Sequence, residues 1–377
     1  MDYDLAVLGL GGMGSAVAAH AAQRGLRVAG FERFGLVHDL GSSAGRTRII
    51  RRAYFEDAAY VPLLDRAYTL WRELEERSQH ALLDLFGVLM MGTPDSATIR
   101  GMSAAARAFE IPIEHLDATQ LRARFPELAV AHDDIGLFEP DAGVVFPERA
   151  IAAHLNVARD YGAHLYDRVR VQSYEPDDDG VSVSFEGGER VRATRLAICM
   201  GAWTATLLNA IPLPLRVQRN VQYWFATSRA TYGPSDLPAF FLERATLPAP
   251  LYGIPDLGDG LKVAFHGHGP TARADELDRD VHDDEVEVMR ETLEGLMPNA
   301  QPRLRSAKAC MYTMTPDGNF AIGRLPEHPN VVIACGFSGH GFKFAPAIGE
   351  IVVQLLLGET PPYDLGFLAF DRLLSGT

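Results

Sequence analysis

Short apolar runs that end in glycine-rich turns are the clearest pattern in the chain. Residues 4–8 and 27–31 are apolar runs of the kind found in buried parallel strands, and the alanine-rich residues 16–24 between them predict a helix. A third apolar run, over residues 196–203, also ends in a glycine turn, and a hairpin pattern around residues 177–180 precedes it. This order of strand, helix and strand predicts an α/β domain with a parallel sheet.

Two longer helices and a second group of strands are expected elsewhere in the chain. Residues 60–76 and 345–357 predict helices, and the strand-like runs around Trp224, Phe240 and Phe241 predict a second sheet. A chain of 377 residues is long enough for two domains, and it contains no tandem repeat or low-complexity tract. We therefore expect a mixed α/β (α+β) protein of two domains.

Composition narrows the class of protein further. The hydrophobic content of 47% and charged content of 22% are ordinary for a globular protein, and no apolar run approaches the roughly 20 residues that span a bilayer. The acidic start at residues 1–4 is unlike a signal peptide, and three cysteines without a Cys-x-x-Cys pair favour a reducing cytoplasm. The net charge of −14 argues against nucleic acid and anionic membrane as partners. We expect no metal site.

A dinucleotide fingerprint follows the first predicted strand. Gly9, Gly11 and Gly14 allow a tight turn, close approach of a pyrophosphate and close packing of helix on strand. Glu32 lies eighteen residues past Gly14, at the end of the second strand, where an acid accepts hydrogen bonds from a ribose. The fingerprint does not separate NAD from FAD. FAD is favoured because the chain returns to the same domain near residue 196, as large flavoproteins often do.

Several motifs in one order give the chain a resemblance to a known family. They are Gly9-x-Gly11-x-x-Gly14, Thr47–Arg51, Leu261–Lys262 with His266, Cys310–Thr313, and Gly336–Phe344. On these motifs, nearly end to end, the chain resembles the monomeric sarcosine oxidase family, which includes N-methyltryptophan oxidase and pipecolate oxidase. The resemblance implies a Rossmann-like FAD-binding domain, a catalytic domain built on a large antiparallel sheet, and oxidation of secondary amino acids with reduction of oxygen to hydrogen peroxide.

The same resemblance suggests a division into domains. Residues 1–85, 145–215 and 320–377 are expected to form a discontinuous FAD-binding domain. Residues 86–144 and 216–319 are expected to form the substrate and catalytic domain.

Cys310 matches the position at which the family attaches its flavin. The implied bond is a thioether to the 8α-methyl group, and it requires a thiolate beside an oxidised flavin. The alternative is a buried structural cysteine, which is the usual fate of cysteine in a strand. We accept that alternative for Cys199 and Cys335, and we expect covalent FAD at Cys310.

Arg51 and Lys343 match the residues that hold the substrate carboxylate. Arginine offers a planar fork for two oxygens, and lysine adds a compact charge. The alternative for each is ordinary surface solvation, which their apolar neighbours make less attractive. Arg52 is expected to point outward while Arg51 points inward. Glu56 and Tyr252 are also expected at the substrate pocket, although a solvated Glu56 is an equal alternative.

Three further residues match positions with catalytic roles in the family. Lys262 is implied to promote the reaction with oxygen, where its charge would stabilise developing superoxide and peroxide. His266 lies on the same face of the predicted strand as Lys262, because side chains alternate with a period of two, and it is implied to line the amine pocket. A satisfied structural histidine is the alternative. Arg48 is implied to favour the anionic reduced flavin.

The remaining cofactor contacts follow from the same alignment of motifs. They are Gly12, Met13, Arg33, Ser42, Thr47, Val169, Gly201, Trp203, Gly339, Gly341 and Phe342. Arg48 and Lys343 are expected to contact the cofactor in addition to the roles given above. The helix predicted from residue 345 would point its amino end at the flavin.

The chain departs from the family's pattern at residues 43–46. Typical members have two histidines and an acid in this segment, and this chain has Ser43-Ala44-Gly45-Arg46. The turn at Leu257–Gly260 is also one residue shorter than in typical members, and the region around Leu242 does not match. Sarcosine is therefore only the default substrate, and an N-methyltryptophan or pipecolate type of substrate is the alternative. A flavin dehydrogenase with another electron acceptor, or a non-catalytic FAD-binding subunit, would be a rival function. We expect a monomer.

Overall fold

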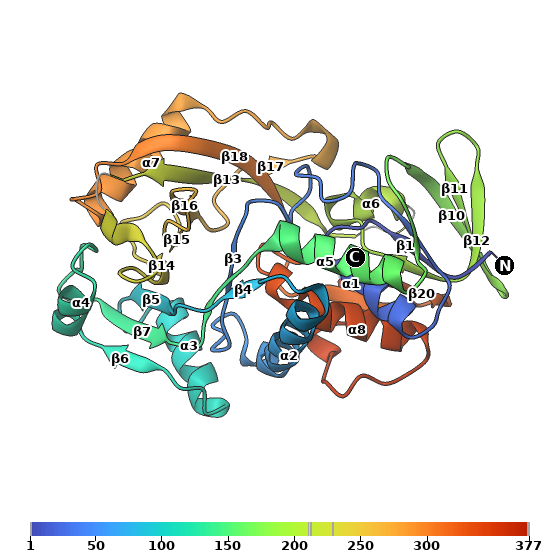
Figure 1. The fold of residues 1–377 in the computed structure, drawn as a ribbon, viewed down its shortest axis with the longest axis horizontal. Coiled ribbons are helices and arrows are strands. Elements are labelled where there is room, and N and C mark those ends of the chain that lie inside the picture. Colours follow the sequence, from blue (N-terminus) through green and yellow to red (C-terminus); the bar gives the residue numbers. More distant parts are fainter. Residues whose placement is uncertain (1, 210, 212, 228–229, 375–377) are drawn as a thin grey trace.

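Two large β-sheets lie toward opposite ends of the longest axis in the computed structural model (Figure 1). The structure describes residues 2–209, 211, 213–227 and 230–374. The predicted mixed α/β architecture is confirmed, with helices packed beside one sheet and a second, largely antiparallel sheet beyond them.

The first sheet has eight strands around a parallel centre. The parallel strands lie in the order β9 (His164–Tyr166), β2 (Val28–Phe31), β1 (Tyr3–Leu8), β12 (Arg190–Ile198) and β20 (His328–Cys335). A hairpin of β10 (Val171–Asp177) and β11 (Gly180–Phe185) extends the amino-terminal half of β12, and β19 (Ala321–Leu325) pairs with β20. The predicted strands at residues 4–8 and 27–31 and the hairpin at residues 177–180 are confirmed.

One predicted strand differs in its bounds. Strand β12 begins at Arg190 and ends at Ile198, and residues Gly201–Trp203 form a 3₁₀ helix, η2, instead of continuing the strand. Gly201 has a φ of +52°, so the predicted glycine turn after this strand is confirmed.

The carboxyl ends of the parallel strands meet at one edge of the sheet. The residues that follow these ends, Gly9, Glu32, Cys199 and Gly336, all line one cavity. A crevice outside the carboxyl ends of parallel strands is the usual ligand site of open α/β sheets.

The second sheet has nine strands. Their order is β17 (Thr271–Ala272), β13 (Arg216–Ala226), β16 (Leu261–Phe265), β15 (Leu251–Ile254), β14 (Ala239–Glu243), β5 (Val88–Gly92), β7 (Ile135–Glu139) and β6 (Glu114–Leu116), with β18 (Arg303–Met314) also paired to β13. All pairs are antiparallel except β5 with β14. The strands predicted around Trp224, Phe240 and Phe241 are confirmed in β13 and β14.

A small third sheet connects the two large ones. It consists of β3 (Arg48–Ile50), β8 (Gly143–Val145) and β4 (Leu83–Asp84). These strands are too short to give a pattern in the sequence. The predicted domain border between residues 144 and 145 falls inside β8, and the division into domains remains a proposal.

Four helices pack together beside the parallel sheet: α1 (Gly12–Gln23), α2 (Val61–Ser78), α5 (Pro147–Asp160) and α8 (Ala345–Leu356). The others are α3 (Ala97–Ala108), α4 (Ala118–Arg124), α6 (Thr204–Leu207) and α7 (Asp283–Leu296), and the remaining 3₁₀ helices are η1 (Ala58–Tyr60), η3 (Ala230–Tyr232), η4 (Ala274–Glu276), η5 (Phe342–Phe344), η6 (Gly366–Leu368) and η7 (Phe370–Leu373). The helices predicted at residues 60–76 and 345–357 are thus confirmed as α2 and α8.

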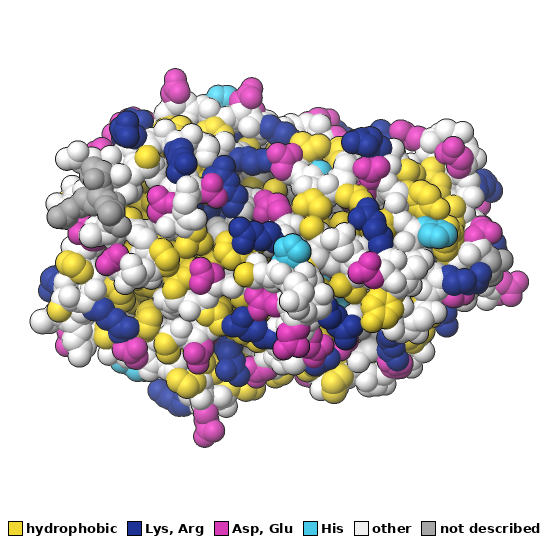
Figure 2. Space-filling view, viewed as in Figure 1, with side chains coloured by type: hydrophobic (Ala, Val, Ile, Leu, Met, Phe, Trp, Pro, Cys, Tyr) yellow, Lys and Arg dark blue, Asp and Glu magenta, His cyan; other side chains and the backbone are white. Residues whose placement is uncertain are grey.

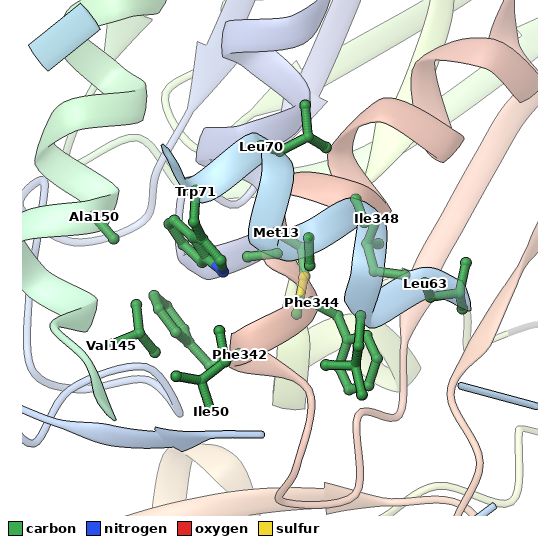
Figure 3. Packing of buried hydrophobic residues seen from close by; sticks show 14 of the residues in the cluster. Met13, Ile50, Leu63, Leu70, Trp71, Val145, Ala150, Phe342, Phe344 and Ile348 are labelled. Atoms are coloured by element: carbon green, nitrogen blue, oxygen red, sulfur yellow. The ribbon is translucent and has the colours of Figure 1, made fainter. Parts of the chain in front are cut away.

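The core between these helices fixes the segment that carries Lys343. Trp71 of α2 stacks on Phe342, with ring centroids 6.1 Å apart, and its Nε1 donates to the Lys343 carbonyl oxygen at 2.8 Å (Figure 3). Phe344 and Ile348 continue this apolar packing into α8. Both aromatic residues that flank Lys343 are therefore anchored in the core, which holds the lysine in one place.

Charged side chains of both signs are mixed over the surface. Acidic and basic side chains are interspersed over the face in Figure 2. No helix among the described residues is long and apolar enough to cross a bilayer. No group of three or more His, Cys, Asp or Glu in the same residues is arranged to hold a metal ion, and the three cysteines are free.

Candidate active site

One long cavity brings most of the predicted site residues together. It is lined by Gly9, Gly11, Gly12, Met13, Glu32, Arg33, Ser42, Arg48, Arg51, Glu56, Val169, Gly201, Trp203, Tyr252, His266, Gly339, Gly341, Phe342 and Lys343, among others. Gly14, Thr47, Lys262 and Cys310 do not line it and lie behind its wall. The cavity runs from the edge of the parallel sheet to one face of the antiparallel sheet.

The glycine turn after β1 brings helix α1 close to the strand. Gly9 has a φ of +83°, which a residue with a side chain rarely adopts. A Cβ atom on Gly14 would lie only 1.7 Å from the Gly9 carbonyl oxygen, so only glycine fits there. The amino end of α1 follows Gly11, which has no side chain to cap it, and it lines the cavity, where the Gly12 amide donates to Ser43 Oγ at 3.2 Å. Uncapped amides at a helix amino terminus bind anions such as phosphate.

Glu32 provides an anionic acceptor at the end of β2. Its Oε2 accepts a hydrogen bond from the Leu10 amide at 2.9 Å, and its Oε1 accepts one from the Phe34 amide at 3.1 Å. Burial alone would raise the pKa of this carboxyl, but the hydrogen bonds from His38 and the two amides lower it overall. Glu32 is thus ionised and suited to a ribose diol.

An ion pair joins the two sheets at this end of the cavity. Arg33 Nη1 lies 2.6 Å from Asp275 Oδ1, which also accepts a hydrogen bond from Trp203 Nε1 at 2.7 Å. The Arg33 guanidinium packs over the rings of Phe34 and Trp203. Asp275 belongs to η4, which follows the antiparallel sheet, so this cluster ties the two parts together beside the nucleotide end.

Two buried cations converge at the other end of the cavity. The Arg51 guanidinium and the Lys343 ammonium lie 4.5 Å and 5.1 Å from the ring centroid of Tyr54. Burial and then the charge of Arg51 lower the pKa of Lys343 to about 7. The expectation of one inward and one outward arginine is confirmed, because Arg51 is 4% exposed and the half-exposed Arg52 is paired with Asp65.

Glu56 partly balances these cations. Its Oε2 lies 2.6 Å from Arg51 Nη2. Burial opposes ionisation, but the charges of Arg51, His340 and Lys343 outweigh it and lower the pKa of Glu56 to about 2. A solvated Glu56 was one of the two expectations, and the structure instead places the carboxylate in the ion pair. Two cations and one anion leave a net positive pocket that suits a carboxylate ligand.

Aromatic side chains and a neutral histidine line the space beside this pair. Phe55 and Phe241 have ring centroids 5.2 Å apart, and Phe241 also packs edge-on against His266. Burial lowers the pKa of His266 to about 4, so its imidazole is neutral near pH 7. Tyr252 and Tyr312 complete the wall. An apolar pocket with one neutral imidazole favours an uncharged amine over an ammonium.

Lys262, Arg48 and Cys310 form a cluster behind the cavity wall. Lys262 Nζ donates to the carbonyl oxygens of Gly45 and Thr47, each at 2.7 Å, and burial and then Arg48 lower its pKa well below its usual value. Cys310 Sγ lies 4.0 Å from Arg48 Nη2. Neither Lys262 nor Cys310 lines the cavity, whereas Ser42 and Arg48, both in contact with Cys310, do.

Some residues of the site had no separate role in the sequence prediction. His340 lies within the glycine-rich motif and contacts Tyr54 through its Nδ1 at 2.6 Å, while burial lowers its pKa to about 4. Phe55 follows the arginine motif, and Cys199 lines the cavity although it was expected to be only structural. Proximity to the glycine-rich and arginine motifs was the available signal for His340 and Phe55.

Together, the fold and the site define a dinucleotide-binding protein with two buried cations, Arg51 and Lys343, across the cavity from the nucleotide turn. The chain belongs to the FAD dependent oxidoreductase family (DAO), whose model matches residues 4–355. This membership confirms the resemblance found in the sequence and the prediction of FAD as cofactor. The protein is an FAD-dependent oxidoreductase.

Individual relatives agree with this family. A monomeric sarcosine oxidase of Streptomyces avermitilis is 42% identical over 98% of both chains. An N-methyl-L-tryptophan oxidase of Salmonella heidelberg is 36% identical over 97% of both chains. Among solved structures, NikD, described as an unusual amino acid oxidase essential for nikkomycin biosynthesis, matches with a TM-score of 0.87 and 25% identity over 97% of both chains.

The residues present fit FAD. The uncapped amino end of α1, the ionised Glu32 and the crowded glycines at positions 9 and 14 form a cradle for a pyrophosphate and a ribose. The cavity continues from this cradle past Arg48 to the Arg51 and Lys343 pair, so a ring system bound beyond the pyrophosphate would lie next to the carboxylate pocket.

Proposed function

We propose that this protein is an FAD-dependent oxidase of secondary, N-methyl amino acids such as sarcosine. The observation that carries the proposal is the convergence of Arg51 and Lys343, both buried, on one end of a cavity whose other end is the dinucleotide cradle. The relatives named as sarcosine and N-methyl-L-tryptophan oxidases support the same class of substrate.

The side chains of the pocket bind and orient the substrate. Arg51 and Lys343 hold the carboxylate from two directions, which fixes the substrate at one end. His266, neutral because its pKa is about 4, faces the amine as a hydrogen-bond acceptor. Phe55, Phe241 and Tyr252 exclude water from the bond that reacts. FAD, when bound, supplies the two-electron acceptor for the C–H bond next to the amine and passes the electrons to oxygen.

Further site roles are part of the same proposal. Lys262 is held by two carbonyl oxygens beside Arg48, and a cation at this position would stabilise the negative charge that develops on oxygen. Cys310 would carry the FAD through a thioether at the 8α-methyl group. Sγ lies 4.0 Å from Nη2 of Arg48, and Arg48 lines the cavity, so the thiol is close to the space that FAD would fill, which supports this attachment. The other cofactor contacts are proposed as the resemblance implies them.

The cellular location, the oligomeric state and the choice of substrate are also part of this proposal. The free cysteines support a reducing cytoplasm, and a monomer is proposed because the relative from Streptomyces avermitilis is named a monomeric sarcosine oxidase. Sarcosine, N-methyl-L-tryptophan and L-pipecolate are the substrates to compare.

Peroxide and aldehyde production test the proposal. Purified protein is incubated in air with each of the three amino acids, and hydrogen peroxide and formaldehyde are measured over time. We expect peroxide from at least one of them, with one formaldehyde per peroxide for an N-methyl substrate. Reduction of an artificial electron acceptor without peroxide would instead identify a dehydrogenase, and no amine-dependent reaction by FAD-loaded protein would overturn the proposal.

A further inference from the structure

Three amide side chains on β13 face the same side of the sheet as Cys310. Gln218, Asn220 and Gln222 alternate along the strand and therefore share one face. Asn220 lies directly across from Cys310 in the antiparallel pair of β13 and β18. Directly opposed residues of such a pair lie on the same face, with Cβ atoms about 4.5–5.5 Å apart.

The Asn220 side chain is buried without a partner for its oxygen. It is 5% exposed, and its Oδ1 has no hydrogen-bond partner among the described residues. Its Nδ2 donates to the Gln218 carbonyl oxygen at 3.2 Å, which settles which end of the amide is the oxygen. Burying an unpaired amide oxygen costs about 1–3 kcal/mol, and asparagine is also disfavoured in strands. A contribution to stability therefore does not explain why an asparagine occupies this position.

The Cys310 thiol is held only by long contacts. Its Sγ lies 3.8 Å from the carbonyl oxygens of Ser42 and Met311 and 4.0 Å from Arg48 Nη2. The Asn220 oxygen lacks a donor and the thiol lacks a close acceptor, although the two residues are directly opposed. The register places the two side chains next to each other on one face, so a hydrogen bond between them would pair the amide oxygen.

We propose that Asn220 is a positioning residue for Cys310: its Oδ1 accepts the thiol hydrogen and holds Sγ in place until the thiol gives up this proton and attacks the FAD. This inference rests on the thioether in the proposed function. In the attachment, the S–H bond and one C–H bond of the 8α-methyl group break and a C–S bond forms. The electron pair reduces the flavin, and dioxygen then takes up this pair with two protons as hydrogen peroxide.

The rate of attachment tests the inference. Full-length apoprotein is mixed with FAD in air, samples are precipitated with acid, and flavin in the pellet and intact protein mass are followed over time. Asn220→Leu keeps the shape of the side chain without an acceptor, and Asn220→Thr keeps a neutral oxygen. We expect attachment to Asn220→Leu to be about tenfold slower, the effect of one lost hydrogen bond. Asn220→Thr should be slowed less than Asn220→Leu, and reversible FAD affinity should not change.

A matched control comes from the same pair of strands. Ser306 on β18 also has a buried oxygen without a partner in the described structure, but it lies opposite Trp224 and not opposite Asn220. Ser306→Ala should attach FAD at the parent rate. If Asn220→Leu does not fold, Asn220→Ala tests the same acceptor.

The outcomes separate this inference from the proposed function. A parent protein that releases all its flavin into the acid supernatant would remove the thioether itself. A parent with covalent flavin and a folded Asn220→Leu or Asn220→Ala variant that attaches FAD at the parent rate would overturn the role of Asn220 alone. Slow attachment with weakened reversible FAD binding would also overturn it, because Asn220 would then act on the cofactor site in general.

Discussion

Arg51 and Arg52 are neighbours in sequence, yet their guanidinium groups lie in opposite environments. Arg51 is buried beside Glu56 and the Tyr54 ring, whereas Arg52 pairs with Asp65 in the α2 helix at the surface. The difference comes from the position of Arg51 just after β3, where alternating residues point to opposite sides. The adjacent arginines therefore offer a matched pair of mutations.

Replacing Arg51 should lower the catalytic efficiency much more than replacing Arg52. Arg51→Gln removes a charged donor from the carboxylate, and we expect kcat/KM for the amino acid to fall by about 10- to 100-fold. Arg52→Gln, which loses only an exposed ion pair, should change kcat/KM by less than about twofold. Steady-state kinetics of both variants would check this, and equal losses would contradict a special role for Arg51.

Lys343 should make carboxylate binding depend on pH. Its pKa is about 7 in the free protein, and a bound carboxylate favours the protonated form and raises that pKa. Binding of a carboxylate ligand without an amine should therefore be constant below pH 7 and weaken as pH rises through about 7. His266 and His340 have pKa values of about 4 and stay neutral over this range.

Titration of the dissociation constant between pH 6 and 9 would measure this effect, with a slope approaching about tenfold per unit above the pKa. The variant Lys343→Arg keeps a positive charge that does not titrate in this range, so its affinity for the carboxylate should not depend on pH. An affinity of the parent protein that stays flat across this range would contradict a lysine in the carboxylate site.

At the level of secondary-structure elements, the pattern of the sequence predicted the dinucleotide cradle and strands of the antiparallel sheet, and it did not predict the small sheet that carries Arg48. The order of β1, α1 and β2 with Glu32 follows from apolar runs and spaced glycines. Strands β3, β4 and β8 have only two or three residues each and give no periodic signal. The contact of Phe55 with Phe241 depends on long-range packing that spacing alone does not encode.

Gly14 should be essential to the packing of α1 on β1. In Gly14→Ala the new Cβ would collide with the Gly9 carbonyl oxygen, so the turn must open and the phosphate site is lost. We expect the variant to be isolated with little or no flavin. In Gly295→Ala, in α7, the new Cβ atom would have no other atom within 4 Å, so this variant should keep the flavin content of the parent protein. Flavin absorbance per protein would be compared, and equal content in both would contradict the cradle.

At the level of the whole molecule, the cavity lies between the two large sheets, and residues from both of them line it. Glu32 and Gly336 come from the parallel sheet, whereas His266 and Tyr252 come from the antiparallel one. A ligand that fills this cavity binds the folded state alone and stabilises it by mass action. In Cys310→Ser, whose FAD would be held reversibly, the melting temperature should rise by several degrees as FAD is added. No rise at saturating FAD would contradict binding between the sheets.

Anaerobic reduction of the protein-bound flavin tests the central claim most directly. The protein is mixed without oxygen with sarcosine, N-methyl-L-tryptophan or L-pipecolate, the visible flavin absorbance is followed, and air is then admitted. An oxidase of secondary amino acids should lose the flavin band with at least one of them and regain it in air, with one hydrogen peroxide per flavin. A flavin band that none of these amino acids bleaches would contradict the assignment.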